Sequence, residues 1–157
     1  QDRHTTYILS AGVKLHNPEE KINVLPALRK YIADLRKDSE EKEDSPQRRI
    51  ARRSLTLVFA QVREAALYRY EREKKYDIAL VNLEVANEIS PTHWGVAYER
   101  ARIYARAGQK NKSFEHLEKA IEFGFRNWQE VEAEEAFEKI RQEAKFQNLL
   151  AQIKEVK

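Results

Sequence analysis

The chain has 157 residues, of which 35% are charged and 41% hydrophobic, and its formal net charge is +3. This length suits a single domain with its own core, and no apolar run approaches the ~20 residues that cross a bilayer. Cysteine is absent, which excludes disulfides, thiol catalysis and thiolate metal sites.

Residues 1–45 form a predicted N-terminal helical extension that ends in an acidic loop. Methionine is absent even at position 1, so we expect a chain that was processed, trimmed or excised. Gln1 suits a mature N-terminus after signal cleavage, and an artificial boundary explains it equally well. The compartment of this soluble chain, cytoplasmic or exported, stays open. For this N-terminal extension, a degenerate helical pair and an irregular arm are equal alternatives.

Helical spacing begins within this extension. A short pattern covers residues 7–15, and the segment 17–20 (NPEE) has the features of a helix start. One apolar stripe follows at Leu25, Leu28, Ile32 and Leu35. Pro26 lies inside the stripe, so we expect a kink or a break near Leu25. Residues 38–44 (DSEEKED) contain no apolar side chain and predict a solvated loop.

A long helix is predicted from the Ser45–Pro46 cap to about Lys74, ~29 residues in all. Its first turns carry four arginines, a type of residue that the positive end of the helix dipole disfavours. They are Arg48, Arg49, Arg52 and Arg53. Neutralisation by the acidic residues just upstream is one explanation. The alternative is a patch for an acidic partner surface or for nucleic-acid phosphate.

Charge is uneven along the chain. Residues 47–75 contain nine basic and three acidic residues, whereas residues 115–143 contain four basic and nine acidic ones. Such opposed segments could steer a charged partner or allow head-to-tail association. Nucleic acid is not the favoured partner, because the net charge is small and no aromatic–basic recognition motif is present.

Equivalent residues recur at a spacing of 34. The pairs are Tyr70 and Tyr104, Ala79 and Ser113, Leu83 and Leu117, and Ala86 and Ala120. A fixed period of this size is typical of stacked helical pairs. Gly108 fits a helix C-cap with positive φ, and Pro91 stops the helix before it.

At these residues the chain resembles the tetratricopeptide repeat family. One repeat would cover residues 60–93 and the next residues 94–127, within a segment of two helix pairs over 46–127. The first repeat departs from the family pattern at Arg63, Leu67 and Lys74, and the second at Ala97 and Phe125. The resemblance implies an all-α, right-handed helical solenoid.

The C-terminal segment, residues 128–157, resembles the element that caps many bacterial arrays of this family. A terminal repeat needs a cap because its apolar stacking face would otherwise be exposed. Six residues are suited to cover that face. They are Phe137, Ile140, Phe146, Leu149, Leu150 and Ile153.

The resemblance also implies a concave groove lined by the first helix of each repeat. The matching positions most suited to bind a protein or peptide form two strips. The first strip is Glu64, Tyr68 and Glu71, and the second is Tyr98, Arg102 and Arg106. Tyrosine and arginine are enriched at binding hot spots, and ordinary solvated helix surface is the equal alternative.

No catalytic constellation, metal-ligand spacing or phosphate-binding loop is found, so we expect no enzyme activity, no metal and no cofactor. His93, at a repeat boundary, is predicted to have a packing or turn role. The leading hypothesis is a non-catalytic scaffold for protein–protein interaction. The alternative is an accessory or C-terminal helical region of a larger enzyme or transport protein. A homodimer through the N-terminal stacking surface stays open.

Overall fold

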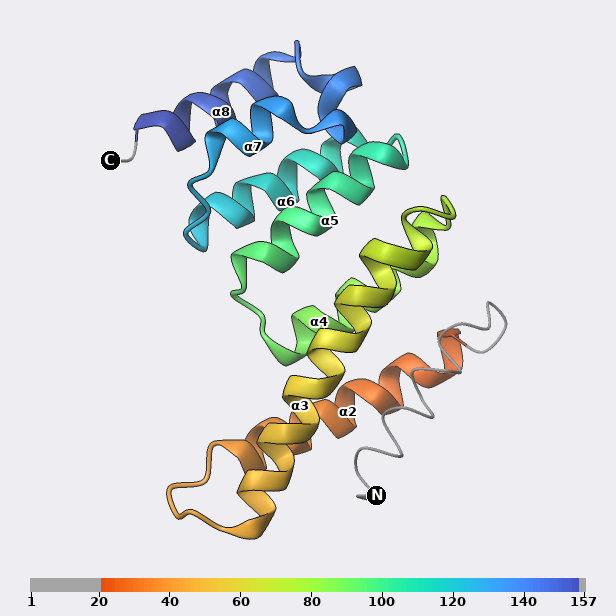
Figure 1. Cartoon of the computed structure of the whole chain (residues 1–157), viewed down its shortest axis with the longest axis vertical. Helices are drawn as coiled ribbons and strands as arrows, with labels where there is room; N and C mark the ends of the chain where they lie inside the picture. The colour runs from red at the N-terminus through yellow and green to blue at the C-terminus, as the bar shows by residue number, and fades with distance from the viewer. Residues whose placement is uncertain (1–20, 156–157) are drawn as a thin grey trace. The chain divides into compact units, whose positions relative to one another are not determined.

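The computed structural model describes the backbone of residues 21–155 and the side chains of residues 28–155. All regular structure in this range is helical, which confirms the predicted all-α class (Figure 1). The chain divides into two compact units, residues 1–91 and 92–157. The division follows Pro91, close to the predicted boundary between the two repeats. The helical pattern of residues 7–15 and the helix start at 17–20 lie outside the described residues.

Unit 1 contains α2 (Lys21–Ser39), α3 (Pro46–Glu64), a π-helical segment η1 (Ala65–Tyr70) and α4 (Tyr76–Ile89). Helix α2 packs against both α3 and α4. The predicted stripe is buried at Leu28, Ile32 and Leu35. Arg29 of α2 adds ion pairs to two carboxylates of α4, Glu84 and, at 3.0 Å, Glu88. These contacts tie the extension to the helix pair that follows it.

Helix α2 runs through Pro26 without interruption, so of the kink or break expected near Leu25 the break does not occur. A proline inside a helix removes one backbone hydrogen bond and crowds the preceding turn. That cost is local. Burial of the three apolar side chains that follow it stabilises the same helix, and tertiary packing commonly overrides residue propensity.

The start of α3 matches the prediction, whereas the acidic loop begins after Ser39 instead of at Asp38. Ser45 has extended backbone angles, and its hydroxyl accepts a hydrogen bond of 3.0 Å from the Arg48 backbone N–H. Pro46 occupies the first turn, where its missing N–H costs nothing. The cap therefore fixes where α3 begins.

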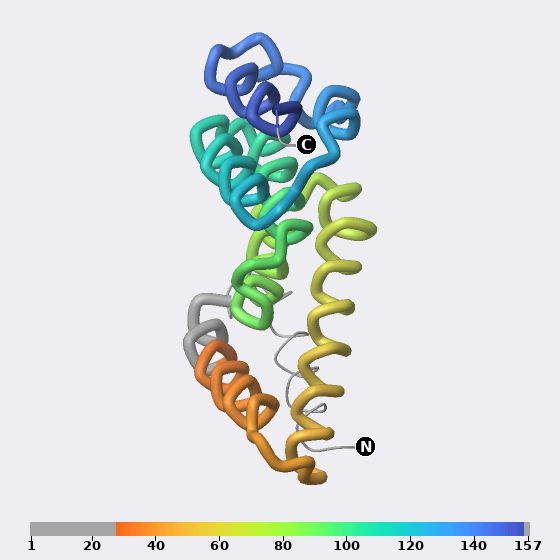
Figure 2. Tube along the Cα trace, turned by 90° about the vertical axis from the view of Figure 1, so that its left-hand side faces the viewer, coloured from red at the N-terminus to blue at the C-terminus, as the bar shows by residue number. Residues whose placement is uncertain are grey.

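The long helix differs from the prediction at its C-terminal end. Its α-helical part stops at Glu64, and π-helical geometry continues it only to Tyr70 instead of Lys74. Figure 2 shows α3 and η1 as one continuous helical segment. Buried residues explain the change of geometry, because Val58, Val62, Ala66 and Tyr70 follow one another at intervals of four. An α-helix has 3.6 residues per turn and would rotate such a series away from the core, whereas the wider π turn keeps it inward.

Two turns, 34 residues apart, close the first helix of each pair in the same way. Lys74 (φ 57°) and Gly108 (φ 74°) both have left-handed backbone conformation. The N–H of the next residue bonds five residues back in each case, from Lys75 to Tyr70 at 2.8 Å and from Gln109 to Tyr104 at 2.9 Å. This is the Schellman pattern. The predicted C-cap role of Gly108 is confirmed.

Unit 2 contains α5 (Trp94–Arg106), α6 (Lys110–Glu122), α7 (Trp128–Ala133), a 3₁₀ segment η2 (Glu135–Ile140) and α8 (Ala144–Glu155). Helices α5 and α6 form an antiparallel pair (Figure 1). The buried Ser113 hydroxyl donates a 2.8 Å hydrogen bond to the carbonyl of Ala101, which shows how closely the two helices approach. His93 accepts a hydrogen bond from the Val96 backbone N–H and so caps α5, in agreement with its predicted turn role.

The core of unit 2 joins α5 and α6 to the C-terminal segments. Six apolar residues predicted to cover the last repeat are all buried in one cluster with residues of α5 and α6. They are Phe137, Ile140, Phe146, Leu149, Leu150 and Ile153. Helix α8 packs on α6 and α7, and η2 packs on α5.

Candidate functional site

The first predicted strip lies on unit 1 and faces outward in part. Glu64 ends α3 and is exposed, and Tyr68 of η1 is 62% exposed. Glu71 follows η1 and is half-buried. The Arg72 guanidinium lies 5.5 Å from the centre of the Tyr68 ring, where it makes a cation–π contact. Despite this contact, Tyr68 is the most exposed of the large hydrophobic residues of unit 1 that the structure describes.

A longer exposed line runs along α3 and η1 on the side away from the core. Its members, spaced by three or four residues, are Ile50, Arg53, Leu57, Ala60, Glu64 and Tyr68. We name this line the outer stripe. Three of these residues, Ile50, Leu57 and Tyr68, are large exposed hydrophobic residues, with exposures of 38, 49 and 62%. Intervals of three and four are those of a helical seam that packs on another helix.

The two charged members of the outer stripe have no partner among the described residues. Within the described residues, neither Arg53 nor Glu64 makes a hydrogen bond or an ion pair. Most other charged residues of this chain are already engaged, as Arg49 is with Asp44 at 2.8 Å. An unpaired arginine and glutamate between apolar residues leave this surface with unused binding capacity.

The second predicted strip does not form an open surface, and the expectation for Tyr98 is corrected. Tyr98 is only 3% exposed. Its ring stacks on Phe125 at 4.5 Å between centres and meets the edge of Phe137 at 6.0 Å. Its hydroxyl is buried without a hydrogen-bond partner in the described chain. Burial, with the nearby Glu130 and Glu134 carboxylates, raises the pKa of Tyr98 above its usual value.

The arginines of the second strip hold the C-terminal segment, with Arg102 half-buried and Arg106 exposed. Arg102 and Arg106 reach the same carboxylate, Glu134, at 3.2 and 3.4 Å. Glu134 also accepts a 3.0 Å hydrogen bond from the Ala136 backbone N–H and so caps η2. Arg141 donates to the Glu134 carbonyl at 2.9 Å. One glutamate thus joins α5 to the segment that covers it.

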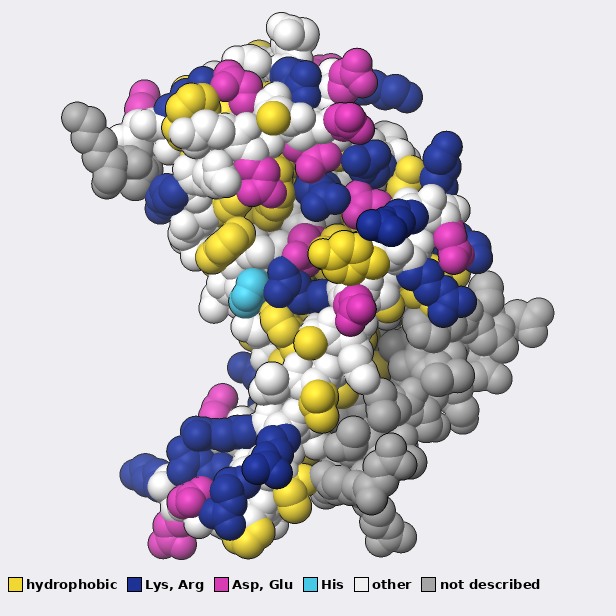
Figure 3. Space-filling view, in the orientation of Figure 1, with side chains coloured by type: hydrophobic (Ala, Val, Ile, Leu, Met, Phe, Trp, Pro, Cys, Tyr) yellow, Lys and Arg dark blue, Asp and Glu magenta, His cyan; other side chains and the backbone are white. Residues whose placement is uncertain are grey.

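The four arginines at the start of α3 are partly used within unit 1. Arg49 pairs with Asp44, and Arg52 donates a 3.0 Å hydrogen bond to the carbonyl of Ser39 at the end of α2. Arg48 is half-buried, and its Nε has no hydrogen-bond partner in the described chain. Figure 3 shows basic side chains gathered over this end of α3. Arg48 and Arg52, like Arg49 and Arg53, are four residues apart, so the four arginines lie within one arc of about 140° on α3.

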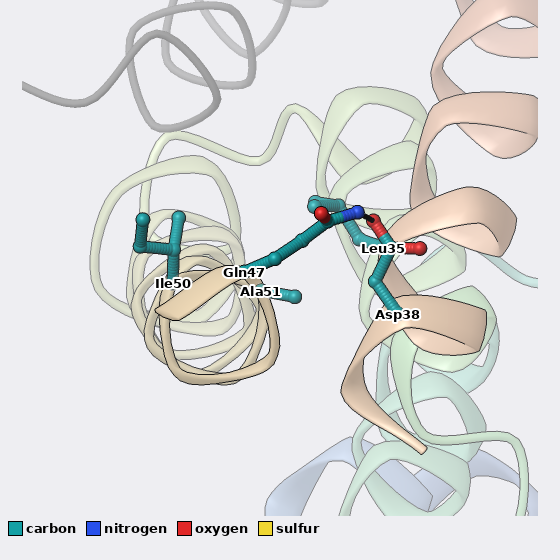
Figure 4. Close-up of a pocket in the computed structure, with 5 residues that line it drawn as sticks. All are labelled: Leu35, Asp38, Gln47, Ile50 and Ala51. Atoms are coloured by element: carbon teal, nitrogen blue, oxygen red, sulfur yellow. Dashed lines mark hydrogen bonds between the residues drawn. The ribbon is translucent and has the colours of Figure 1, made fainter. Parts of the chain in front are cut away.

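A pocket lies between α2 and α3, with a volume of about 340 Å³. Leu35, Asp38, Gln47, Ile50 and Ala51 line it (Figure 4). The Gln47 side chain reaches across and donates a 3.1 Å hydrogen bond to Asp38, whereas Ile50 points away from that contact (Figure 4). With one carboxylate, one amide and three apolar residues, the pocket holds no nucleophile–base pair.

Histidine and carboxylate side chains can together form clusters with the geometry of a metal site. Within the described part of the chain, no group of three or more histidine, aspartate or glutamate side chains could hold a metal ion. His116 is buried against Tyr104, at 4.9 Å between ring centres, and its Nδ1 lies 2.9 Å from the Lys112 carbonyl. Burial lowers the pKa of His116 to about 4, so it is neutral at physiological pH.

Sequence reasoning found Glu64 and Tyr68 but missed Ile50, Arg53 as a stripe member, Leu57 and Ala60. Their signal was present: Leu57 is a large apolar residue two positions after the buried Leu55. A residue two positions along a helix points about 200° away, which is outward.

Comparison with protein-family models, with curated protein sequences and with solved structures gives no match. Among the described helices, none combines the length and the apolar character that crossing a membrane demands. Since no comparison points to a functional site, the geometry of the outer stripe alone makes it the candidate site.

Proposed function

We propose that this chain is a non-catalytic protein-interaction module and that its contact surface is the outer stripe of α3 and η1. One observation carries the proposal: one helical seam holds three large exposed hydrophobic side chains and two charged ones that make no ion pair with any described residue. Exposed apolar groups in a row with polar neighbours are typical of protein-binding surfaces. Glu64 and Tyr68, which were predicted to bind a partner in a concave groove, are members of the outer stripe in this proposal.

We also infer that the two helix pairs are tetratricopeptide-like repeats of a short solenoid. The turns at Lys74 and Gly108 support this, because the same backbone hydrogen-bond pattern recurs after 34 residues. The burial of Ala79 and Ser113, and of Leu83 and Leu117, at equivalent positions supports it further.

A matched pair of variants tests the binding surface. Leu57→Glu places a charge in the outer stripe, and Thr56→Glu places the same charge on the neighbouring exposed residue, about 100° around the helix. Each protein serves as bait in native-source extract, and captured proteins are identified by mass spectrometry. Both variants must first show the far-ultraviolet circular dichroism of the wild type.

We expect the wild-type bait to capture a specific protein, either another protein or an untagged copy of this chain. The Leu57→Glu bait should no longer capture it, whereas the Thr56→Glu bait should. Capture that is equal with both variants would remove the outer stripe as the site. An absence of any specific protein, this chain included, would contradict the interaction function.

A further inference from the structure

The outer stripe is complementary to itself when two copies of the helix run in opposite directions. Reversal places Ile50 opposite Tyr68, Arg53 opposite Glu64 and Leu57 opposite Ala60, because each pair of numbers sums to nearly the same value. Every apolar residue then meets an apolar residue, and each unpaired charge meets its opposite. We propose that a second copy of this chain binds the outer stripe and forms an antiparallel two-fold dimer. This inference rests on the function proposed above and names the partner.

Symmetry strengthens the match. A two-fold axis near residue 59 repeats every contact, so the Arg53–Glu64 pair forms twice. Arg53 and Glu64 lie eleven residues, about three turns, apart and therefore face the same side of the helix. They are members of the seam themselves, so in the antiparallel pair each Arg53 is level with a Glu64 of the other copy.

The opposite orientation is disfavoured by the same residues. A parallel, in-register pair would bring Arg53 next to Arg53 and Glu64 next to Glu64. Neither side chain has another partner in the described chain that could neutralise it. Like charges at a helical seam are unfavourable, and such residues commonly fix the orientation of a helix pair.

A head-to-tail contact between the basic and acidic segments is a weaker alternative. The carboxylates of the acidic segment are largely paired within unit 2. Lys119 binds Glu115 at 2.8 Å, and Lys110 binds Glu143 at 3.0 Å. Such residues would have to leave existing partners, whereas Arg53 and Glu64 lose none.

The size of the contact predicts a reversible dimer. From Ile50 to Tyr68 the stripe spans about 27 Å at 1.5 Å per residue. One helix pair of this length falls at the small end of specific interfaces, where complexes are transient. We therefore expect dimerisation in roughly the micromolar range.

Charge reversal tests the pairing by sedimentation equilibrium of the full chain over about 1–500 μM. Arg53→Glu and Glu64→Arg each place like charges together twice, so we expect each to raise the dimer dissociation constant at least about tenfold. The double variant Arg53→Glu/Glu64→Arg restores both pairs and is expected to return near the wild-type value. Mixing the two single variants should give a heterodimer. Lys30→Glu, at an exposed site on α2, is the control and should leave the dimer unchanged.

Cross-linking tests the orientation, and the absence of native cysteine removes any background. Ala60→Cys lies near the axis, so a short bismaleimide should join the two copies. Tyr68→Cys would lie about 27 Å from its symmetry mate and should not cross-link. Cross-linking of both variants would indicate a parallel pair and would overturn the proposal.

The outcomes separate this inference from the function on which it rests. A wild-type chain that stays monomeric at all concentrations, or a double variant that fails to recover, overturns the self-pairing. If a different protein is then still lost from the extract with Leu57→Glu, the interaction function stands with another partner. If Leu57→Glu changes neither sedimentation nor capture, both proposals fail.

Discussion

The aromatic ring of Tyr98, and not its hydroxyl, makes the packing contacts of this residue. The ring packs between Phe125 and Phe137, while the hydroxyl is buried without a hydrogen bond in the described chain. An unsatisfied buried hydroxyl destabilises the folded state. Removal of the oxygen and removal of the ring should therefore have opposite effects.

We expect Tyr98→Phe to leave the free energy of unfolding unchanged or to raise it by up to about 1 kcal/mol. Tyr98→Ala should lower it by about 3–5 kcal/mol, since a large cavity forms. Urea denaturation followed by circular dichroism measures both. A Tyr98→Phe variant that loses more than 1 kcal/mol would show that the hydroxyl has a structural partner.

His116 makes stability depend on pH. Its pKa is about 4 in the folded chain, chiefly because burial disfavours the charged ring. The unfolded histidine takes up its proton near pH 6.5, so the unfolded state binds more protons between pH 6.5 and 4. Stability is therefore lost as the pH falls through this window.

We expect the contribution of His116 to decrease by at most about 1.4 kcal/mol per pH unit between pH 6.5 and 4. His116→Gln keeps a hydrogen-bond donor but cannot titrate, so its stability should fall less steeply over that range. The comparison is made by urea denaturation at half-unit steps. Parallel profiles for the two proteins would contradict the assignment of this pH dependence to His116.

At the scale of elements, the equivalent turns at Lys74 and Gly108 offer a matched test. Both residues have positive φ, which costs a side-chain-bearing residue energy and glycine almost none. Lys74→Gly should raise the free energy of unfolding by about 1 kcal/mol. Gly108→Ala should lower it by about 1 kcal/mol from backbone strain alone, since no atom lies within 4 Å of the added Cβ.

Thermal denaturation of the two variants provides the measurement. Equal shifts of the same sign would mean that backbone conformation does not control these turns.

Local sequence rules predicted elements well where the physical cause was local. Ser45 with Pro46 placed the start of α3, and Gly108 placed a turn, because caps and turns depend on adjacent residues. The π-helical segment was missed because a period of 3.6 was assumed throughout. Its cause is a buried series at intervals of four, which shows only when the core is known.

The same difference between local and distant causes separates the predicted binding residues that are exposed from those that are buried or half-buried. Glu64 and Tyr68 are exposed because their side of α3 and η1 faces away from the core of unit 1. Tyr98 and Arg102 were assigned by analogy with a repeat pattern. In the structure, both instead contact residues that are distant in the sequence: Phe125 stacks on Tyr98, and Glu134 pairs with Arg102. A pattern within one helix could not contain that information.

At the scale of the whole molecule, the uneven charge is balanced within each unit. Residues 1–91 contain 17 basic and 15 acidic residues, and residues 92–157 contain 12 and 11. The basic start of α3 is partly neutralised by Asp44. Neither unit therefore has the strong positive charge typical of a nucleic-acid-binding protein.

We expect no electrophoretic shift of duplex DNA or of RNA by this chain at about 0.1 M salt. Phosphate binding depends on several unpaired cations acting together, and two of the four arginines at the start of α3, Arg49 and Arg52, already have partners in unit 1. A shift that disappears with Arg48→Ala/Arg53→Ala would contradict this expectation and restore the arginine patch as a binding site.

The π-helical segment also bears on how the length of this chain can change. A π turn contains one residue more than the α turn that could replace it, so Ala65–Tyr70 holds a residue that helix continuity does not need. Deletion elsewhere in α3 would rotate all later side chains by about 100°. Deletion of Ala65 should instead be absorbed by conversion to α-helix, with Tyr70 still buried. Among the described helices, this is the segment where deletion of one residue should destabilise the fold least.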